Sequence, residues 1–153
     1  MLHPVARYES KHDPEQLDST AALALELALN RAFVVALLLT RQEELAEQAV
    51  MKGIDRLKPG ALTADAILNE TIQSCELSDV SVCCDSEIAE ERSSNFLPPA
   101  LQAVTRLAPL YRQCFVLRLL VGLSRDASGR LLQLDASHVD AFASAGAQQI
   151  AGV

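Results

Sequence analysis

The chain has 153 residues and a formal net charge of −7, and half of its residues are hydrophobic, although only 4% are aromatic and tryptophan is absent. This length supports one ordinary domain or two very small ones. A core of leucine, alanine and valine favours helices over sheets. The negative charge argues against a general affinity for nucleic acid, which requires clustered lysine and arginine. We therefore expect an all-α protein.

The charge is unevenly distributed along the chain. Residues 1–96 carry 8 basic and 17 acidic side chains, a net charge of −9, whereas residues 97–153 carry 5 and 3, a net charge of +2. Residues 59–99 contain 8 acids and a single basic residue, Arg92. This acidic stretch would repel DNA.

The first predicted helix covers residues 20–39. Its segment 21–39 is long enough to span a membrane, but Glu26, Asn30 and Arg31 lie near its centre. A charge at the centre of a membrane span costs about 2.5–3.5 kcal/mol. We therefore expect a buried helix of a bundle.

Capping signals divide the rest of the first half. Candidate caps for the first helix are Asp18, Ser19 and Thr20. Thr40 and Glu43 have the spacing of a capping box, which predicts a second helix over 43–57. Apolar residues at steps of three and four predict a third helix over 63–76.

The segment 78–96 is rich in serine, aspartate and glutamate and has no sustained hydrophobic period. Such a composition is typical of a solvated linker. The sequence therefore predicts two small helical lobes, at 18–77 and 97–151, joined by the acidic linker 78–96. We expect proteases to cut first within this linker.

Three helices are predicted in the C-terminal part. The first follows two adjacent prolines, is interrupted or restarted at Pro109, and ends at Gly122. Ser124 and Asp135 are candidate caps for the next two helices. The predicted ranges are 99–121, 124–132 and 136–150.

The N-terminal residues contain no apolar run of signal-peptide length, which predicts a cytoplasmic protein. No two of the four cysteines form a Cys-x-x-Cys pair, and a reducing compartment would keep them as thiols. We therefore expect no metal, cofactor or disulfide. The cysteines are Cys75, Cys83, Cys84 and Cys114.

No catalytic site is expected either. Ser137, His138 and Asp140 contain the residue types of a nucleophile and its base. Neighbouring helical residues project about 100° apart, however, and cannot form a hydrogen-bonded catalytic pair. The sequence thus predicts a protein that is not an enzyme.

The C-terminal part resembles region four of sigma-70 factors, in particular the compact extracytoplasmic-function class. The resemblance rests on Leu97-Pro98, on the run Phe115-Val116-Leu117-Arg118, and on Gly122-Leu123-Ser124 leading into a pair of short helices. Such a pair has the layout of a helix-turn-helix, whose second helix lies in the major groove of DNA.

The first half is similar to region two of the same family. Residues 46–50, Ala-Glu-Gln-Ala-Val, stand where the family has an acidic amphipathic helix after a short turn, and Asn69 falls in the helix that follows. The resemblance implies a transcription initiation or regulatory protein that binds core RNA polymerase. The implied polymerase-binding residues are Glu43, Glu44, Glu47 and Val50.

The candidate DNA contacts are Arg118, Arg125 and Arg130, because the guanidinium group suits phosphate. The reading helix departs from the family, since residues 131–153 contain no lysine or arginine. Gln133 stands where the family usually has glycine, and Ser128 and Gly129 replace larger packing residues. The positions expected to face DNA hold Asp140, Phe142, Ala145 and Ala147.

Two functional alternatives follow from these departures. The first is a divergent sigma factor that still directs polymerase to promoters. The second is a sigma-derived helical module for protein–protein interaction that no longer binds DNA, and the missing cations favour it. A further regulatory protein partner fits either alternative. In both cases the isolated protein is expected to bind DNA weakly and no membrane partner is expected.

Overall fold

The computed structural model describes residues 14–77 and 97–152, and all regular secondary structure in these ranges is helical. The expectation of an all-α fold is therefore confirmed for this part of the chain. It contains seven α-helices and one π-helical turn, η1. Their bounds are α1 Pro14–Thr40, α2 Glu43–Arg56, α3 Ala64–Ser74, α5 Pro99–Thr105, α6 Pro109–Phe115, η1 Val116–Leu120, α7 Arg125–Leu132 and α8 Ala136–Ala151.

The start of α2 differs from the predicted capping box. Thr40 is the last residue of α1, and its hydroxyl donates to the carbonyl of Ala36 at 2.8 Å. The N-cap position of α2 is Gln42, whose side chain makes no capping hydrogen bond. The prediction was wrong because a threonine hydroxyl can bond to the carbonyl four residues earlier in a continuing helix. Arg41, with φ 58°, provides the break instead.

The start of the first helix also differs from its prediction, whereas the start of α3 does not. The predicted caps of the first helix, Asp18, Ser19 and Thr20, lie inside α1, which begins at Pro14. The cap of α3 follows the usual rule, because the Thr63 hydroxyl accepts from the backbone N–H of Ala66 at 3.2 Å. A polar residue at a predicted start therefore caps its helix only where no longer helix extends through it.

The predicted helix 99–121 is divided into α5, α6 and η1. The chain leaves the helical conformation at Ala108, because the residue before a proline is disfavoured there, and Pro109 begins α6. At the end of the segment the Val121 N–H donates to the Val116 carbonyl at 2.9 Å, five residues back, which is the π-helical pattern. Gly122, with φ +82°, then ends the helix.

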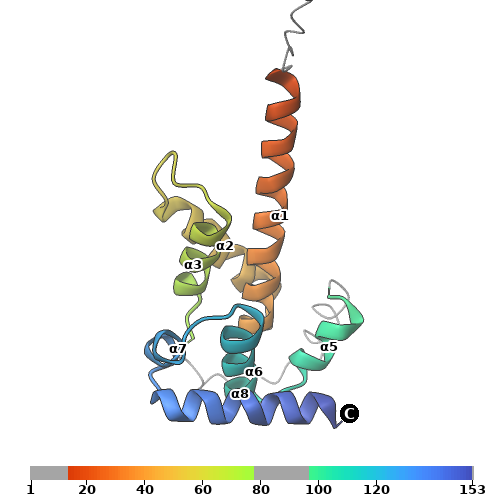
Figure 1. The fold of residues 1–153 in the computed structure, drawn as a ribbon, viewed down its shortest axis with the longest axis vertical. Helices are drawn as coiled ribbons and strands as arrows, with labels where there is room; N and C mark the ends of the chain where they lie inside the picture. Colours follow the sequence, from red (N-terminus) through yellow and green to blue (C-terminus); the bar gives the residue numbers. More distant parts are fainter. Residues whose placement is uncertain (1–13, 78–96, 153) are drawn as a thin grey trace, which may run out of the picture.

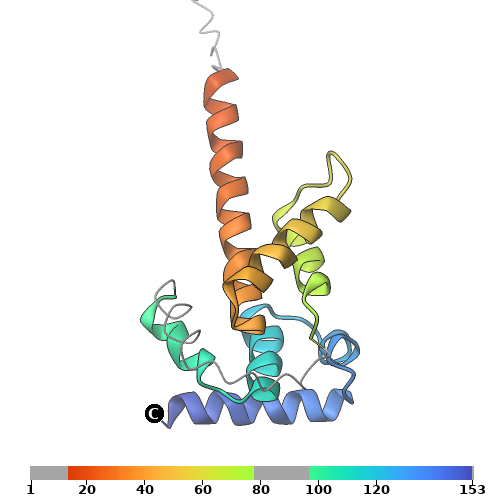
Figure 2. The same ribbon diagram turned by 180° about the vertical axis from the view of Figure 1, so that it is seen from behind.

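The helices form two groups that meet at the C-terminal end of α1. In the first group α1, α2 and α3 pack on one another; in the second, α6 packs on α8, and α7 lies beside α8. Figures 1 and 2 show α8 across one end of the molecule, with α6 between α8 and the end of α1. Buried side chains of both groups belong to one hydrophobic cluster. The linker 78–96 lies outside the described residues.

α1 has a buried half and an exposed half. Leu37, Leu38 and Leu39 are each 1% exposed, whereas Leu23 is 59% and Leu27 is 70% exposed. Figure 1 shows the N-terminal end of α1 extending beyond α2 and α3. The expectation of a buried bundle helix is correct for the C-terminal half only. By length and composition alone, Ser19–Thr40 is a helix that could cross a membrane, although core helices pass the same test.

α2 and α3 approach closely because α2 presents small residues to α3. A Cβ atom added at Gly53 would lie 2.8 Å from the backbone nitrogen of Thr71 and 3.0 Å from its hydroxyl oxygen. Distances this short force atoms to move, and the nearest of them is backbone. The close contact thus accounts for a glycine in the middle of a helix, where it is otherwise unfavourable.

We expect Gly53→Ala to lower the free energy of unfolding by about 1–3 kcal/mol, because the added methyl group overpacks the α2–α3 contact. Helix propensity alone predicts the opposite, a gain of about 1 kcal/mol. Denaturant-induced unfolding followed by circular dichroism decides between them. Gln48→Ala, on the exposed side of α2, is the control and should change stability by less than about 0.5 kcal/mol. A stabilised G53A variant would show that α2 and α3 are farther apart.

Candidate functional site

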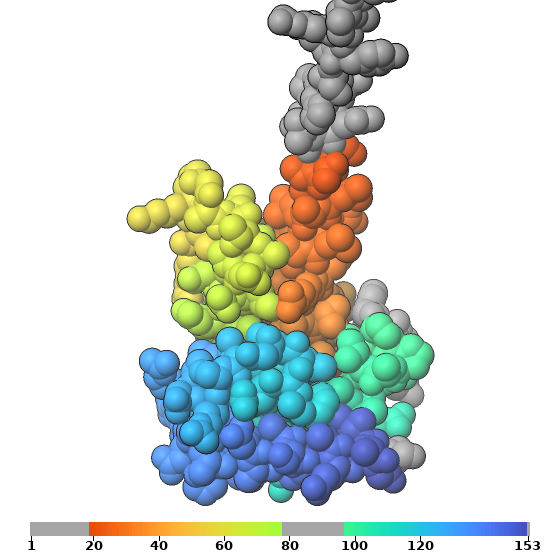
Figure 3. Space-filling view, in the orientation of Figure 1, coloured from red at the N-terminus to blue at the C-terminus, as the bar shows by residue number. Residues whose placement is uncertain are grey.

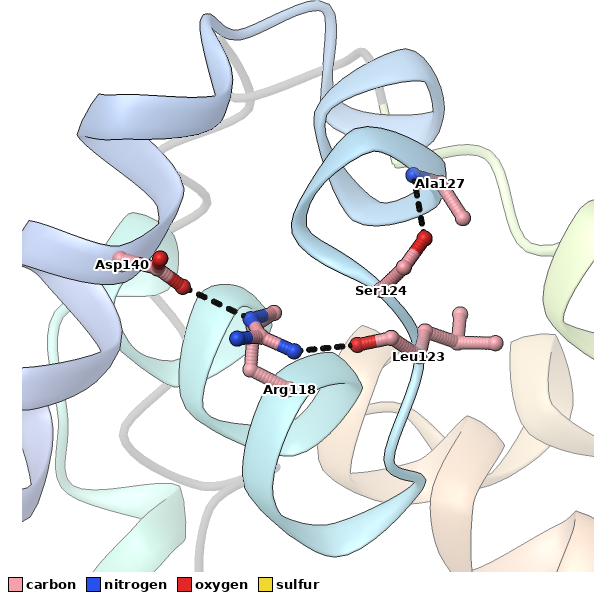
Figure 4. Close-up of polar contacts among 5 residues, drawn as sticks. All are labelled: Arg118, Leu123, Ser124, Ala127 and Asp140. Atoms are coloured by element: carbon pink, nitrogen blue, oxygen red, sulfur yellow. Dashed lines mark hydrogen bonds and ion pairs between the residues drawn. The ribbon is translucent and has the colours of Figure 1, made fainter.

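The candidate site is the unit formed by α7, the three-residue turn 133–135 and α8. α7 begins at a capped end, since the Ser124 hydroxyl accepts from the N–H of Ala127 at 3.1 Å (Figure 4). The helix ends at Gln133, which has the left-handed conformation φ 55°, ψ 42°. Ser124 therefore acts as the predicted cap. Gln133 holds a conformation that glycine adopts without strain.

The small residues of α7 allow the turn to close on the helix. A Cβ at Gly129 would lie 2.6 Å from the carbonyl oxygen of Leu134, so only glycine fits that approach. The N–H of Leu134 donates to the Gly129 carbonyl at 2.9 Å. Ser128 is fully buried beside it. Gly129 thus allows the turn to pack directly on α7.

The side chain of Arg118 is bonded within the protein. Its Nε donates to Oδ1 of Asp140 at 2.8 Å, and its Nη1 donates to the carbonyl oxygen of Leu123 at 2.6 Å. Figure 4 shows these contacts joining η1, α8 and the loop before α7. The two side chains are 28% and 42% exposed, so the pair is partly screened by solvent. Arg118 therefore has a structural role, whatever else it contacts.

The other two arginine candidates lie on the surface of α7. Arg125 is exposed at its first residue, and Arg130 is exposed near its end. Nε of Arg130 makes a long bond of 3.4 Å to the backbone carbonyl of Asp126. The structure therefore does not bring the three candidates together as one cationic cluster: two project from α7, and the third is tied to α8.

The exposed face of α8 differs from the one that the sequence indicated. Asp140, Phe142, Ala145 and Ala147 are all half-buried. Asp140 is held by Arg118, and the ring of Phe142 contacts Tyr111 edge to face at a centroid distance of 5.4 Å. These four residues lie along the two edges of the buried face formed by Val139, Ala143 and Gly146, and do not form the outward face of α8. That they face DNA stays a prediction. The exposed residues of α8 are instead Ser137, His138, Ala141, Ser144, Gln148, Gln149 and Ala151.

The outward face of α8 carries no lysine, arginine or acidic residue. At its start, Asp135 and His138 are the titratable side chains. Nδ1 of His138 lies 3.6 Å from Oδ2 of Asp135, and its ring stacks on Phe142. Asp135 occupies the N-cap position of α8 but makes no side-chain capping bond there. The predicted cap is thus placed correctly, while its carboxylate faces the histidine. Ser137 and Gln148 could donate or accept hydrogen bonds but would neutralise no phosphate.

The polymerase-binding candidates lie on α2 and are split between surface and core. Glu44 and Glu47 are exposed, and Glu43 is half-buried. Val50 is 9% exposed and belongs to the hydrophobic cluster. It therefore packs α2 against the core and is not on the surface that a partner would contact. On the outer side the sequence reasoning missed Met51, which is 60% exposed. The exposed surface of α2 therefore includes a methionine near two acidic side chains.

Arg112, in α6, is a buried cation. It is 4% exposed, and its Nη1 donates to the carbonyl of Leu107 at 3.1 Å. Burial, and secondarily the charge of Arg41, lower the pKa of Arg112 to about 10. The side chain therefore stays charged at neutral pH. No sequence signal distinguishes it from Arg106 or Arg118, because its burial depends on how α6 meets α1.

The two cysteines within the described residues are buried thiols. Burial raises the pKa of Cys75 to about 12 and that of Cys114 to about 11, so neither is a thiolate at neutral pH. Across residues 14–77 and 97–152, no three histidine, cysteine or acidic side chains gather as metal ligands. Cys83 and Cys84 lie outside these ranges.

No family model, no curated protein and no solved structure matches this chain. The chemistry of the α7–α8 unit and of α2 is therefore judged from their own residues.

Replacing Arg118 with methionine is expected to lower the free energy of unfolding by about 1–2 kcal/mol, because it removes a partly exposed ion pair and leaves the Leu123 carbonyl without its donor. Asp140→Asn keeps the bond to Leu123 and should cost less than about 1 kcal/mol. Arg125→Met, on the α7 surface, is the matched control. Denaturant-induced unfolding measures the free energy of unfolding of all three variants. Equal stability of R118M and R125M would show that the bonds of Arg118 to Asp140 and Leu123 do not stabilise the fold.

Gln133→Gly should raise the free energy of unfolding by about 0.5–1 kcal/mol, because glycine adopts a positive φ without steric cost. Gln148→Gly, inside α8, should instead lower it by about 1 kcal/mol. Thermal unfolding of both variants tests the prediction. If Q133G were destabilised as much as Q148G, the turn would not hold a left-handed residue at this position.

Proposed function

We propose that this chain is a sigma-factor-like regulatory protein that acts with RNA polymerase, and that its C-terminal unit is a helix-turn-helix that does not read DNA by itself. The single observation that supports this best is the α7–turn–α8 unit. A serine cap, a left-handed residue and a close glycine contact hold its two short helices together. This is the part of the chain that resembles region four.

The chemistry of the unit argues for assistance from a partner. Specific DNA binding draws much of its affinity from phosphate neutralisation by lysine and arginine. The outward face of α8 supplies serine, alanine and glutamine, and Arg118 is engaged with Asp140. Arg125 and Arg130 remain as surface cations on α7. Polymerase would therefore have to supply most of the contact with promoter DNA.

The surface of α2 is the proposed meeting point with polymerase. Glu44 and Glu47 are exposed on the same side as Met51, which places an apolar side chain beside two acidic ones. Methionine is adaptable at binding surfaces, and charge complementarity favours association with a basic partner surface. In this proposal the two helical lobes of a sigma-like protein have different roles: α2 binds polymerase, and α7–α8 lies near DNA.

A second candidate function is favoured by the bond between Arg118 and Asp140. If the cation that the resemblance offers to DNA serves only to position α8, the unit is a protein-interaction module derived from a sigma factor. Such a module would bind polymerase or another regulator without contacting DNA. Both candidates are non-enzymatic and share the α2 surface, so they differ only in the role of α7–α8.

We expect the purified protein to be captured by core RNA polymerase, and to bind duplex DNA alone only weakly and without sequence preference. The capture should weaken by about tenfold in a Glu44→Arg/Glu47→Arg variant, because the charge of the α2 surface is reversed. Asp65→Arg, an exposed acid at the start of α3, is the matched control. Failure of the wild-type chain to bind polymerase would remove the first candidate.

Promoter fragments with the protein alone, titrated with salt, test the role of α8. Submicromolar, sequence-selective binding at physiological ionic strength would show that α7–α8 reads DNA independently. An Ala141→Arg/Ser144→Arg variant returns cations to the outward face of α8. If that face lies near DNA in the polymerase complex, this variant should bind promoter complexes more tightly, with a salt slope steeper by about 0.9 for each phosphate contacted. No change would favour the interaction module.

A further inference from the structure

A largely apolar stripe runs along α1 from its exposed N-terminal half into its C-terminal half. Leu23, Leu27, Asn30 and Val34 follow one another at steps of four, three and four residues. Leu23 is 59% and Leu27 is 70% exposed, Asn30 is exposed, and Val34 is half-buried. We call these four residues the outer seam of α1.

Apart from Val34, which is half-buried and packs against the hydrophobic cluster, the outer seam is distinct from the face that packs on the body. The inward face of α1 consists of Ala28, Ala32 and Val35, which are at most 7% exposed. At 100° per residue, the seam lies about 140° around the helix axis from that face. α2, α3, α6 and η1 all contact α1. Figures 1 and 3 nevertheless show its N-terminal half rising clear of α6 and α8.

Alternating steps of three and four residues are the spacing of a coiled-coil seam. With Asn30 at a d position, Leu27 and Val34 are at a positions, Glu26 is at g and Arg31 is at e. Both Arg31 and Leu27 are exposed, so the flanking charge and the seam are available together. The helix therefore presents an apolar core stripe, one polar seam residue and an oppositely charged pair.

The charged pair selects the partner. In a parallel two-stranded coiled coil, a g residue faces the e residue five positions later on the other helix. Glu26 and Arg31 are separated by five residues, so in two copies of this helix each glutamate would face the arginine of the partner copy. An antiparallel pair would instead bring g to g and e to e, which places like charges together. The charges are thus complementary to a second, parallel copy of α1.

Asn30 adds a second argument for the same partner. In a parallel pair in register, Asn30 lies opposite its own copy, and the two amides can hydrogen-bond to each other. Because an amide shifted out of register would face an apolar residue, this pairing favours alignment of the two helices in register. We infer that the outer seam of α1 binds a second copy of this chain as a short parallel coiled coil.

The seam covers only about two heptads, so the dimer should be weak, in the micromolar range. Sedimentation velocity from low to high micromolar concentration should show a monomer–dimer equilibrium for the wild-type chain. Leu27→Glu should abolish the dimer without loss of helical content or stability, because Leu27 is exposed in the monomer. Leu62→Glu, at a leucine 50% exposed outside α1, is the matched control and should leave dimerisation unchanged.

Charge reversal tests orientation and partner together. The single variants Glu26→Arg and Arg31→Glu should each weaken dimerisation by roughly tenfold, since each places like charges opposite each other twice. A mixture of E26R and R31E should form a heterodimer, and the double variant E26R/R31E should recover self-association. Homodimers of both single variants with unchanged affinity would overturn the proposal.

Two other occupants of the seam are separate outcomes. A wild-type chain that stays monomeric at all concentrations and floats with neutral phospholipid vesicles would show that α1 binds lipid. A monomer that does neither would also overturn the dimer. Neither result depends on polymerase binding, which is measured through the α2 surface.

Discussion

The structure depends on the need to cover the C-terminal end of α1 on all sides. Leu37, Leu38 and Leu39 are consecutive, so their side chains point about 100° apart around the helix, yet all three are buried. Burial of each leucine contributes about 1.5–3 kcal/mol. One neighbouring layer cannot cover three such directions. α2 and α3 cover part of this end, and α6 and η1 cover another part, which joins the two helix groups.

Close backbone contacts at glycines set the geometry around that junction. Gly53 lets α3 approach α2, Gly129 lets the turn 133–135 close on α7, and a Cβ at Gly146 would lie 3.2 Å from the Tyr111 carbonyl, where α8 crosses α6. The tie from Arg118 to Asp140 and Leu123 then fixes how α8 lies against η1. These contacts determine which side of α8 faces outward, and hence what the α7–α8 unit can bind.

In these proposals, the protein binds its partners through the exposed surfaces of three helices, α1, α2 and α8. The outward face of α8 is polar and uncharged, that of α2 combines Met51 with acids, and the exposed half of α1 is apolar with one complementary charged pair. The three surfaces differ in chemistry, so each would select a different kind of partner. Dimerisation through α1 would bring two α2 surfaces and two α7–α8 units into one assembly, which would raise the effective concentration of each for a repeated target.

The sequence alone predicted the all-α class and the approximate ranges of the helices, because hydrophobic period and proline or serine boundaries are local signals. It placed the cap at Ser124 correctly. It failed at Thr40, where the choice between capping α2 and continuing α1 depends on the length of α1. Tertiary packing alone decided the outward face of α8, the burial of Val50 and Arg112, and the exposure of half of α1. Each of these depends on which neighbouring helix covers a given face, and residues distant in sequence determine that.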